Sequence, residues 1–408
     1  MPERRLKMRI SHPYLIIGKL NKFLKPVIKK ADVWRKKMIP IFVKGIIKSG
    51  SVHLAEIGRQ TKRSCQKMKT IENILSRHLN STSWDEEILS DEYLRNVSRW
   101  VKKDTLIIVD PSERIKPYGE KLENLAYVRD GSSGELFPGY WTLEVVAING
   151  DQIRYLLSKL FSVEDQATPS FPGTIQYYLE GIIEATKGVG IHVLDRGFDS
   201  DDYFNFYQSH QTKMVVRLTG NRTVCDLEGK AIGVIEQFAK KMRLGYLMKY
   251  SIGNKVFWRE FTWLKVTMPD VSGYFTLVIS QEGNEWAYFL TNLEVSTSWE
   301  AERILRYYEY HPQGDQVIRL LKQTTKIEHF LVRSYLAIKR INFLAFLVCA
   351  FILSQGTLSP VVLRWLERLG KCFKLKVEFI YYRIFYGIQS FFRLITPFSL
   401  RGYAKAGG

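Results

Sequence analysis

The fold of this chain is decided by TLIIVD (residues 105–110) and GIHVLDRGF (residues 190–198), two short apolar runs that each reach an aspartate. Each run predicts a buried β-strand, because consecutive apolar and β-branched residues are bounded by turn formers. An ionised carboxylate at the end of such a strand is costly unless a cation lies against it. Asp110 and Asp195 together therefore predict a shared divalent metal site, since hard cations prefer carboxylate oxygens. Taken singly, either aspartate is equally well explained as a turn cap.

Turn and helix signals order the segments around these two runs. The expected elements are a hairpin (140–148 and 153–160), a helix (175–185), a second helix (202–209) and a strand (213–218). Asn149-Gly150 is a strong hairpin signal, and Lys187-Gly188 is a plausible helix end. Because a helical crossover joins them, the two aspartate-bearing strands are expected to be parallel neighbours. This order is typical of a mixed α/β, ribonuclease-H-like fold.

With that order, the chain resembles a DDE transposase of the bacterial insertion-sequence type, which cuts and pastes its element. The resemblance rests on Asp110, on Leu194-Asp195-Arg196-Gly197-Phe198 and on a third motif near residue 315, and it covers roughly residues 40–355. It implies a catalytic fold that is interrupted by a β-rich insertion after its last strand.

The third motif departs from the family pattern. The family helix carries Tyr, Arg, Glu and Lys, and counting back from Lys322 gives Tyr308, His311 and Asp315 in the matching places. The stretch from His311 to Asp315 contains Pro and Gly, which predicts a helix break with Asp315 in the first turn of the next helix. Glu309 is the competing third acid, but it would point away from the face that Tyr308 and Asp315 share.

The resemblance assigns roles to these residues. Asp110, Asp195 and Asp315 would hold two Mg²⁺ (or Mn²⁺) ions for phosphoryl transfer, with Asp110 bridging both ions. The residues expected to contact the DNA end are Tyr308, His311, Lys322 and Arg196. His311 is a weaker phosphate ligand than Arg, because it lacks the bidentate fork and is mostly neutral at physiological pH.

Residues 221–297 change to short strands, expected at 244–250, 255–263, 274–280 and 286–291. Gly253, Gly273 and Gly283 separate these strands as turns. The resemblance implies that an aromatic residue here stacks on a base at the transposon end, and Trp258 and Trp263 are the candidates. A tryptophan in a strand more often packs into a core, so that alternative stays open.

The N-terminal region predicts two helices, a short one at 51–59 and a longer one at 64–79. Apolar residues recur three and four apart in the second helix, which predicts one buried face. Its basic residues, expected on the outside, are Lys62, Arg63, Lys67 and Lys69. This pattern is compatible with a helix-turn-helix that enters a DNA groove, and an ordinary helical hairpin is the alternative.

The 408 residues carry a formal net charge of +19, which lies at the two ends of the chain. Residues 1–50 hold 14 Lys and Arg against 2 acids, and residues 361–408 hold 9 against 2. Clustered cations attract phosphate backbones, although a membrane surface or bulk solvent also suits them. The four cysteines are far apart, which argues against a zinc site and indicates a reducing compartment.

No secretory signal is expected, and the longest apolar run, residues 341–353, is too short to span a bilayer and predicts a buried core helix. The expected division is a helical, basic DNA-binding region (1–95), the first part of the catalytic core (96–220), the β-rich insertion (221–297), completion of the core with the third acid (298–355), and a basic, aromatic helical end (356–408).

The sequence therefore predicts a cytoplasmic, nucleoid-associated transposase. Its expected partners are double-stranded DNA, as terminal inverted repeats and target, and a second copy of the chain, with no membrane. Three alternatives remain: a decayed DNA-binding relative without cleavage, a ribonuclease-H-like nuclease without strand transfer, and a peripheral membrane protein that uses residues 371–393.

Overall fold

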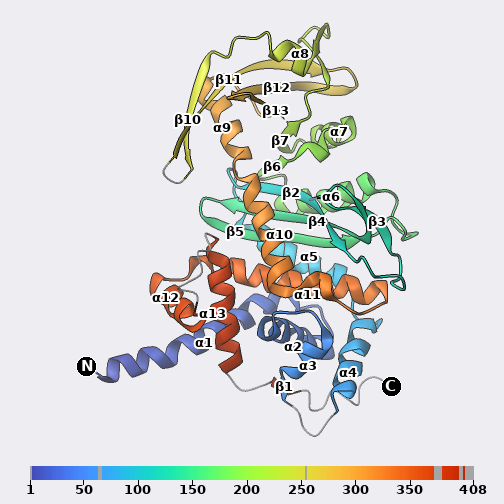
Figure 1. Cartoon of the computed structure of the whole chain (residues 1–408), viewed down its shortest axis with the longest axis vertical. Coiled ribbons are helices and arrows are strands. Elements are labelled where there is room, and N and C mark those ends of the chain that lie inside the picture. The colour runs from blue at the N-terminus through green and yellow to red at the C-terminus, as the bar shows by residue number, and fades with distance from the viewer. Residues whose placement is uncertain are drawn as a thin grey trace.

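The structure is a computed structural model that describes residues 2–62, 67–131, 133–252, 255–371, 379–394 and 398–399. Its centre is a mixed sheet, with a β-rich lobe beyond one edge and most of the helices beyond the other (Figure 1). The fold class expected from the sequence, mixed α/β, is confirmed.

Five strands form the part of the sheet that carries the two aspartates. They are β2 (Leu106–Ile115), β4 (Leu136–Asn149), β5 (Gln152–Phe161), β6 (Ile191–Leu194) and β7 (Lys213–Leu218). β4 is antiparallel to β2 and β5, whereas β2, β6 and β7 are parallel neighbours. β3 (Ala126–Arg129) pairs with the start of β4.

The predicted crossover makes β2 and β6 parallel. Helix α6 (Phe171–Thr186) is capped by the Ser170 side chain, and Lys187 ends it in the left-handed conformation with φ 58°. Val109 is paired with Leu194 in the register of the two strands. Asp110 and Asp195, one residue further along each chain segment, therefore lie side by side. β6 ends at Leu194, but β2 continues past Asp110 to Ile115 because it stays paired with β4, so the prediction that Asp110 ends its strand is wrong. Helix α7 (Asp201–Ser209) then leads into β7.

The hairpin predicted from Asn149-Gly150 is also present. Asn149 pairs with Gln152, and Gly150 has φ 57°, a conformation that a tight turn needs and that glycine adopts without steric cost.

The insertion continues the same sheet. Its elements are β8 (Thr223–Cys225), β9 (Ala231–Val234), α8 (Ile235–Ala239), β10 (Tyr246–Ile252), β11 (Lys255–Met268), β12 (Val271–Glu282) and β13 (Glu285–Thr291). β13 is antiparallel to β7, so the lobe is joined to the catalytic strands by a continuous ladder of backbone hydrogen bonds. Thr297 and Glu300 form a capping box that starts α9 (Ser298–Tyr308), which returns the chain to the core.

The helix break expected near Pro312 lies slightly earlier than predicted. Helix α10 (His311–Thr325) begins just after this break, with Pro312 in its first turn, where a proline ring is tolerated. Asp315 is therefore the fifth residue of α10, just beyond the first turn, and not within it. Gly314 is explained by packing, because a Cβ at this position would come within 2.8 Å of Ile108 Cγ2 on β2.

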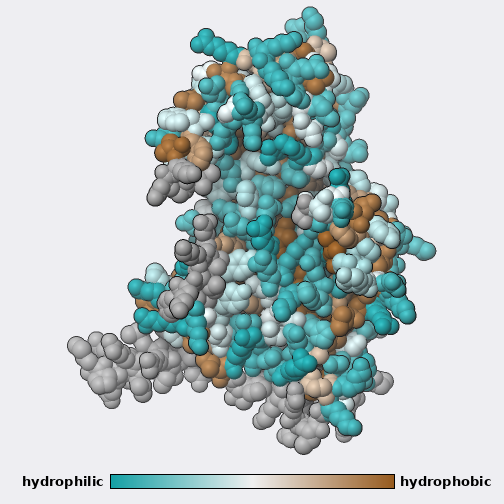
Figure 2. Space-filling view, in the orientation of Figure 1, coloured by the Kyte–Doolittle hydropathy of each residue, from teal (hydrophilic) through white to brown (hydrophobic). Residues whose placement is uncertain are grey.

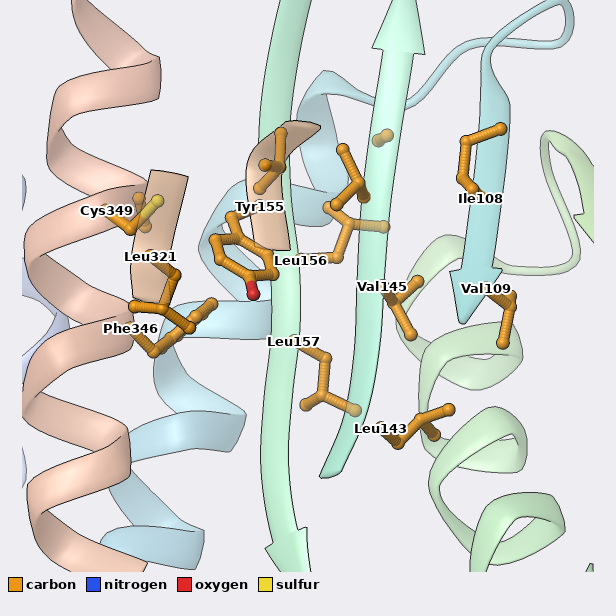
Figure 3. Packing of buried hydrophobic residues seen from close by; sticks show 14 of the residues in the cluster. Ile108, Val109, Leu143, Val145, Tyr155, Leu156, Leu157, Leu321, Phe346 and Cys349 are labelled. Atoms are coloured by element: carbon orange, nitrogen blue, oxygen red, sulfur yellow. The ribbon is translucent and has the colours of Figure 1, made fainter. Parts of the chain in front are cut away.

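The core lies between the sheet and the helices that cover it. Figure 3 shows Tyr155 of β5 facing Leu321 of α10 and Phe346 of α11 (Tyr335–Ser354), with Val145 of β4 pointing to the opposite side. Residues 341–353 of α11 are buried, as predicted for a core helix. By length and composition Tyr335–Thr357 could also cross a membrane, but 89% of its most apolar window is buried inside the protein.

The remaining helices and short strands complete the body. They are α1 (Pro2–Val27), α2 (Val33–Ser49), α3 (Leu54–Arg59), β1 (Thr61–Lys62), α4 (Met68–Asn80), α5 (Glu86–Val97), α10 (His311–Thr325), α12 (Pro360–Leu369), α13 (Ile380–Leu394) and β14 (Phe398–Ser399). Apolar residues of α1, α2 and α13 join the main core, so the basic ends of the chain supply core helices as well as charge.

Candidate active site

Asp110 lies at a crowded point on β2. Its pKa is well above its usual range, first because it is desolvated by burial and then because the carboxylates of Asp195, Asp315 and Glu144 lie nearby. A side-chain hydrogen bond with Asp315 raises this pKa further. Each of these effects disfavours the ionised form of Asp110.

Glu144, which faces Asp110 across the β2–β4 ladder, has a different environment. It forms a fully buried ion pair with Arg114 and accepts a hydrogen bond from the Tyr155 hydroxyl at 2.5 Å. A buried charge is tolerable when it is paired and hydrogen-bonded in this way. Among the described residues, no Lys or Arg forms an ion pair with Asp110, so the charge of this carboxylate is not balanced as that of Glu144 is.

Asp195 both caps a turn and faces Asp110. Its Oδ1 accepts a hydrogen bond from the Gly197 backbone N–H at 3.0 Å and so starts the 3₁₀ turn Arg196–Phe198. The turn-cap explanation from the sequence is therefore correct for one oxygen. The carboxylate is nevertheless close enough to raise the pKa of Asp110. Arg196 lies on this turn and is exposed.

α10 brings Asp315, and not Glu309, to the strand-end carboxylates. Asp315 lies close enough to Asp110 to raise the pKa of that carboxyl. Glu309 instead lies toward the insertion, with its Oε1 3.8 Å from Arg259 Nη1, and burial raises its pKa. The two candidates for the third acid therefore face different parts of the protein.

The chemistry of this donor set fits a divalent cation. Within the residues that the structure describes, no Lys or Arg forms an ion pair with Asp110, Asp195 or Asp315. Repulsion among three carboxylates is relieved when a cation of charge two lies between them. In the same described part of the chain, no three His, Cys, Asp or Glu side chains are already gathered as metal ligands, so the three aspartates would have to close around an ion.

A second cluster lies beside the carboxylates, at the start of α10. The Tyr308 and His311 rings are stacked with centroids 5.2 Å apart, and the Arg217 guanidinium lies 5.5 Å from the centre of the Tyr308 ring. Burial lowers the pKa of His311, while the carboxylates of Asp315 and Asp195 oppose that shift. Arg217 Nε and His311 Nε2 are buried without a hydrogen-bond partner.

Arg217 is a site residue that the sequence analysis missed. Its signal was available, because an arginine interrupts the otherwise apolar strand KMVVRL, where a cation is costly unless it has a purpose. The sequence pattern did not reveal that Tyr308 lies next to Arg217. Only the pairing of β7 with β13 and the path of α9 bring Tyr308 under the Arg217 guanidinium.

Lys322 is not part of this cluster. It follows His311 by 11 residues on the same helix, which corresponds to about 16 Å along the axis. Its Nζ lies 2.6 Å from Glu113 Oε1 and 3.3 Å from Glu328 Oε1. The structure therefore divides the predicted phosphate-binding residues into two groups.

The two tryptophans of the insertion have different environments. Trp258 is 53% exposed, and Lys249 Nζ lies 5.5 Å from its ring centre. Trp263 packs against the core and lies 4.8 Å from the Tyr246 ring. The packing alternative thus applies to Trp263, whereas Trp258 presents an open face.

The N-terminal helices partly match the sequence expectation. α4 buries one apolar face, as predicted, but it begins at Met68 and not at residue 64. Lys67 and Lys69 are exposed, and Lys69 lies 3.9 Å from Glu72. The side chain of Lys62 and the whole of Arg63 lie outside the described residues.

A cavity of about 1690 Å³ opens beside Asp110 and Asp315, and its lining does not include Tyr308, His311 or Arg217. It extends along α10 to the end of α3 at Arg59, and its other wall is the segment that follows Asp110 on β2. Hydrophilic side chains cover much of the surface over α10, while hydrophobic ones gather over the side where β3 and α6 lie (Figure 2). The carboxylates therefore lie between the aromatic cluster and an open polar cavity.

No protein-family model matches this sequence, and no curated protein matches it. Among solved structures, one similar chain is the piggyBac transposase, determined by cryo-EM in a synaptic complex with hairpin DNA. That chain is 13% identical, the match covers 90% of this chain and 82% of that chain, and the TM-score is 0.42. A likeness of this size assigns neither a family nor an activity.

Proposed function

We propose that this protein is a DDE-type transposase that cleaves double-stranded DNA at the ends of its element and joins those ends to a target. One observation carries the proposal. Three carboxylates from separate elements, Asp110 within β2, Asp195 after β6 and Asp315 on α10, approach one another, and no Lys or Arg of the described chain forms an ion pair with them. Such a cluster is costly to the fold and is expected where it serves a function.

In this proposal Asp110, Asp195 and Asp315 hold Mg²⁺ or Mn²⁺. When bound, a pair of such ions lowers the pKa of an attacking water or 3′ hydroxyl and stabilises the leaving oxygen of an in-line displacement. Asp110 suits the shared position, because both other carboxylates approach it. Asp195 keeps one oxygen for its turn and has the other free for this role.

The second cluster supports the proposal by offering a place for the DNA end. The Arg217 guanidinium supplies the planar, fixed positive charge that His311 lacks, and it lies beside Tyr308 and the carboxylates. We assign Arg217 Nε and His311 Nε2, which have no hydrogen-bond partner, as the donors to a phosphate. Trp258, with its open face, is the candidate for stacking on a base of that end.

The test uses the DNA that flanks the gene, searched for inverted repeats and offered as a linear duplex with a target plasmid. We expect Mg²⁺-dependent nicking at the repeat boundary and joining to the plasmid, both lost in Asp195→Asn while DNA binding is retained. Cleavage without joining would favour a ribonuclease-H-like nuclease. Binding without cleavage would favour a decayed relative, and no binding would overturn the proposal.

A further inference from the structure

The cavity beside Asp110 and Asp315 contains a line of cations that no role described above explains. On α10, residues Asp315, Arg319 and Lys322 follow one another at intervals of four and three, which places their side chains on one helix face. Lys326, four residues further on, is the residue that ends the helix, and all four residues line the cavity. The line extends over about 16 Å from Asp315 to Lys326.

Most of these cations are unpartnered. In the described part of the chain, Arg319 and Lys326 form no ion pair, and neither do Arg59 and Arg333 on the other walls of the cavity. All four are exposed. Lys322 differs, because Glu113 and Glu328 hold it.

Acidic residues also line the cavity, but they do not interrupt the line on α10. The acids outside the carboxylate cluster and the Lys322 pair are Glu56, Glu120 and Asp130. They come from α3 and from the segments on either side of β3, whereas Arg319 and Lys322 share one face of α10 and Lys326 ends that helix. The net character of the α10 wall is therefore positive.

We infer that this wall binds the backbone of a second DNA segment, the one that meets the carboxylates from the side opposite Tyr308, His311 and Arg217. The inference rests on the proposed function. A single phosphate group needs one cationic pocket, whereas a wall about 16 Å long matches roughly four to five phosphates along one strand of a duplex. Phosphate contacts of this kind position DNA without reading its sequence.

The two ends of α10 thus bind different parts of the reacting DNA. Tyr308, His311 and Arg217 surround one phosphate beside the carboxylates, and the wall beyond Asp315 binds a strand that continues toward α3. An in-line displacement needs an attacking and a leaving group on opposite sides of the phosphorus, and two separate DNA subsites meet that need. Lys322, once released from Glu113 and Glu328, is available to the same strand.

The experiment measures binding of a labelled duplex of arbitrary sequence by fluorescence anisotropy, without divalent metal, across a salt series. The variant is Arg319→Gln with Lys326→Asn, because Lys326 has φ 50° and Asn tolerates that left-handed conformation. The matched control is Lys102→Gln with Lys103→Gln, two exposed lysines that precede β2 and do not line the cavity. Thermal melting shows whether each variant is folded.

Each lost phosphate contact lowers the slope of log K against log salt by about 0.9, so the α10 variant should lose about two units of slope and the control none. At about 0.1 M salt this corresponds to roughly 60-fold weaker binding. An unchanged slope, or an equal loss in the control, would overturn the inference.

The measurement separates this inference from the proposed function, because it needs no cleavage. If the wild-type protein binds DNA through the wall but never cuts end DNA, the inference stands and the transposase proposal fails. If end DNA is cut while the α10 variant keeps its slope and its KM, the proposal stands and the wall is not a DNA subsite. On end DNA, a supporting result is a raised KM with kcat unchanged.

Discussion

The two ends of α10 border the same carboxylates but are built differently. At the N-terminal end, Tyr308, His311 and Arg217 are packed against one another and partly buried. At the other end, Arg319 and Lys326 are exposed beside an open cavity. Packed rings fix a geometry, whereas exposed cations supply attraction that tolerates different positions. The N-terminal end therefore holds its side chains in one geometry, whereas the other end supplies positive charge without a fixed geometry.

The carboxylates between the two ends should give the largest effect. Asp110→Asn is expected to lower the rate of end cleavage at least about a thousandfold, because loss of a shared metal ligand removes several kcal/mol of transition-state stabilisation. The same change should raise the melting temperature, because it removes a buried charge that faces Asp195 and Asp315.

A metal titration provides a readout besides activity. Mg²⁺ should raise the melting temperature of the wild-type protein and leave that of Asp110→Asn nearly unchanged. If both proteins respond equally to Mg²⁺, Asp110 is not a ligand.

The next test compares Asp315→Ala with Glu309→Ala and decides which of the two residues is the third acid. We expect Asp315→Ala to lose about a hundredfold or more in cleavage, since it removes a ligand, and Glu309→Ala to stay within a few fold of wild type. Asp315→Glu should retain activity if the longer side chain fits above Gly314. The reverse order of the two alanine variants would move the third acid to Glu309.

Arg217→Gln tests the cluster at the N-terminal end of α10. Loss of one charge-assisted hydrogen bond to a phosphate should lower kcat/KM for end DNA by about ten- to hundredfold. Arg217→Lys should restore only part of it, because a lysine lacks the planar fork. Equal activity of the Gln and Lys variants would show that planarity at this position is unimportant.

The smallest effect is one of stability, at the start of β6, the strand that leads to Asp195. His192 is fully buried on β6, its Nδ1 is 2.9 Å from the Tyr207 hydroxyl, and burial lowers its pKa to about 3. The unfolded chain, with a pKa near 6.5, therefore binds a proton that the folded chain does not, so stability falls as pH drops below 6.5. The loss by pH 5 should be about 2 kcal/mol.

His192→Phe should flatten that pH dependence, as followed by denaturant unfolding at pH 5 and pH 7. His329→Asn, at an exposed position, is the control for loss of a histidine. If the His192 variant keeps the wild-type difference between the two pH values, the cause lies elsewhere.

Much of the fold followed from local signals in the sequence. Apolar runs predicted the strands β2, β6 and β7, and Asn149-Gly150 predicted the hairpin, because both depend on residues adjacent in the chain. The end of β2 was not predicted, because the strand continues past Asp110 to Ile115 through its pairing with β4. The crossover rule then placed Asp110 beside Asp195, as observed in the register of β2 and β6.

Other features were decided by contacts between distant segments. Arg217 is beside Tyr308 only because β13 pairs with β7, and Gly314 is required only because α10 packs directly on Ile108. The division of Tyr308, His311 and Lys322 between two sides of the carboxylates depends on where α10 crosses the sheet. Periodicity records which face of an element is buried, but it does not name the element that buries it. The sequence by itself therefore determined the strands, their order and the candidate acids, while only the tertiary structure decided which cations surround them.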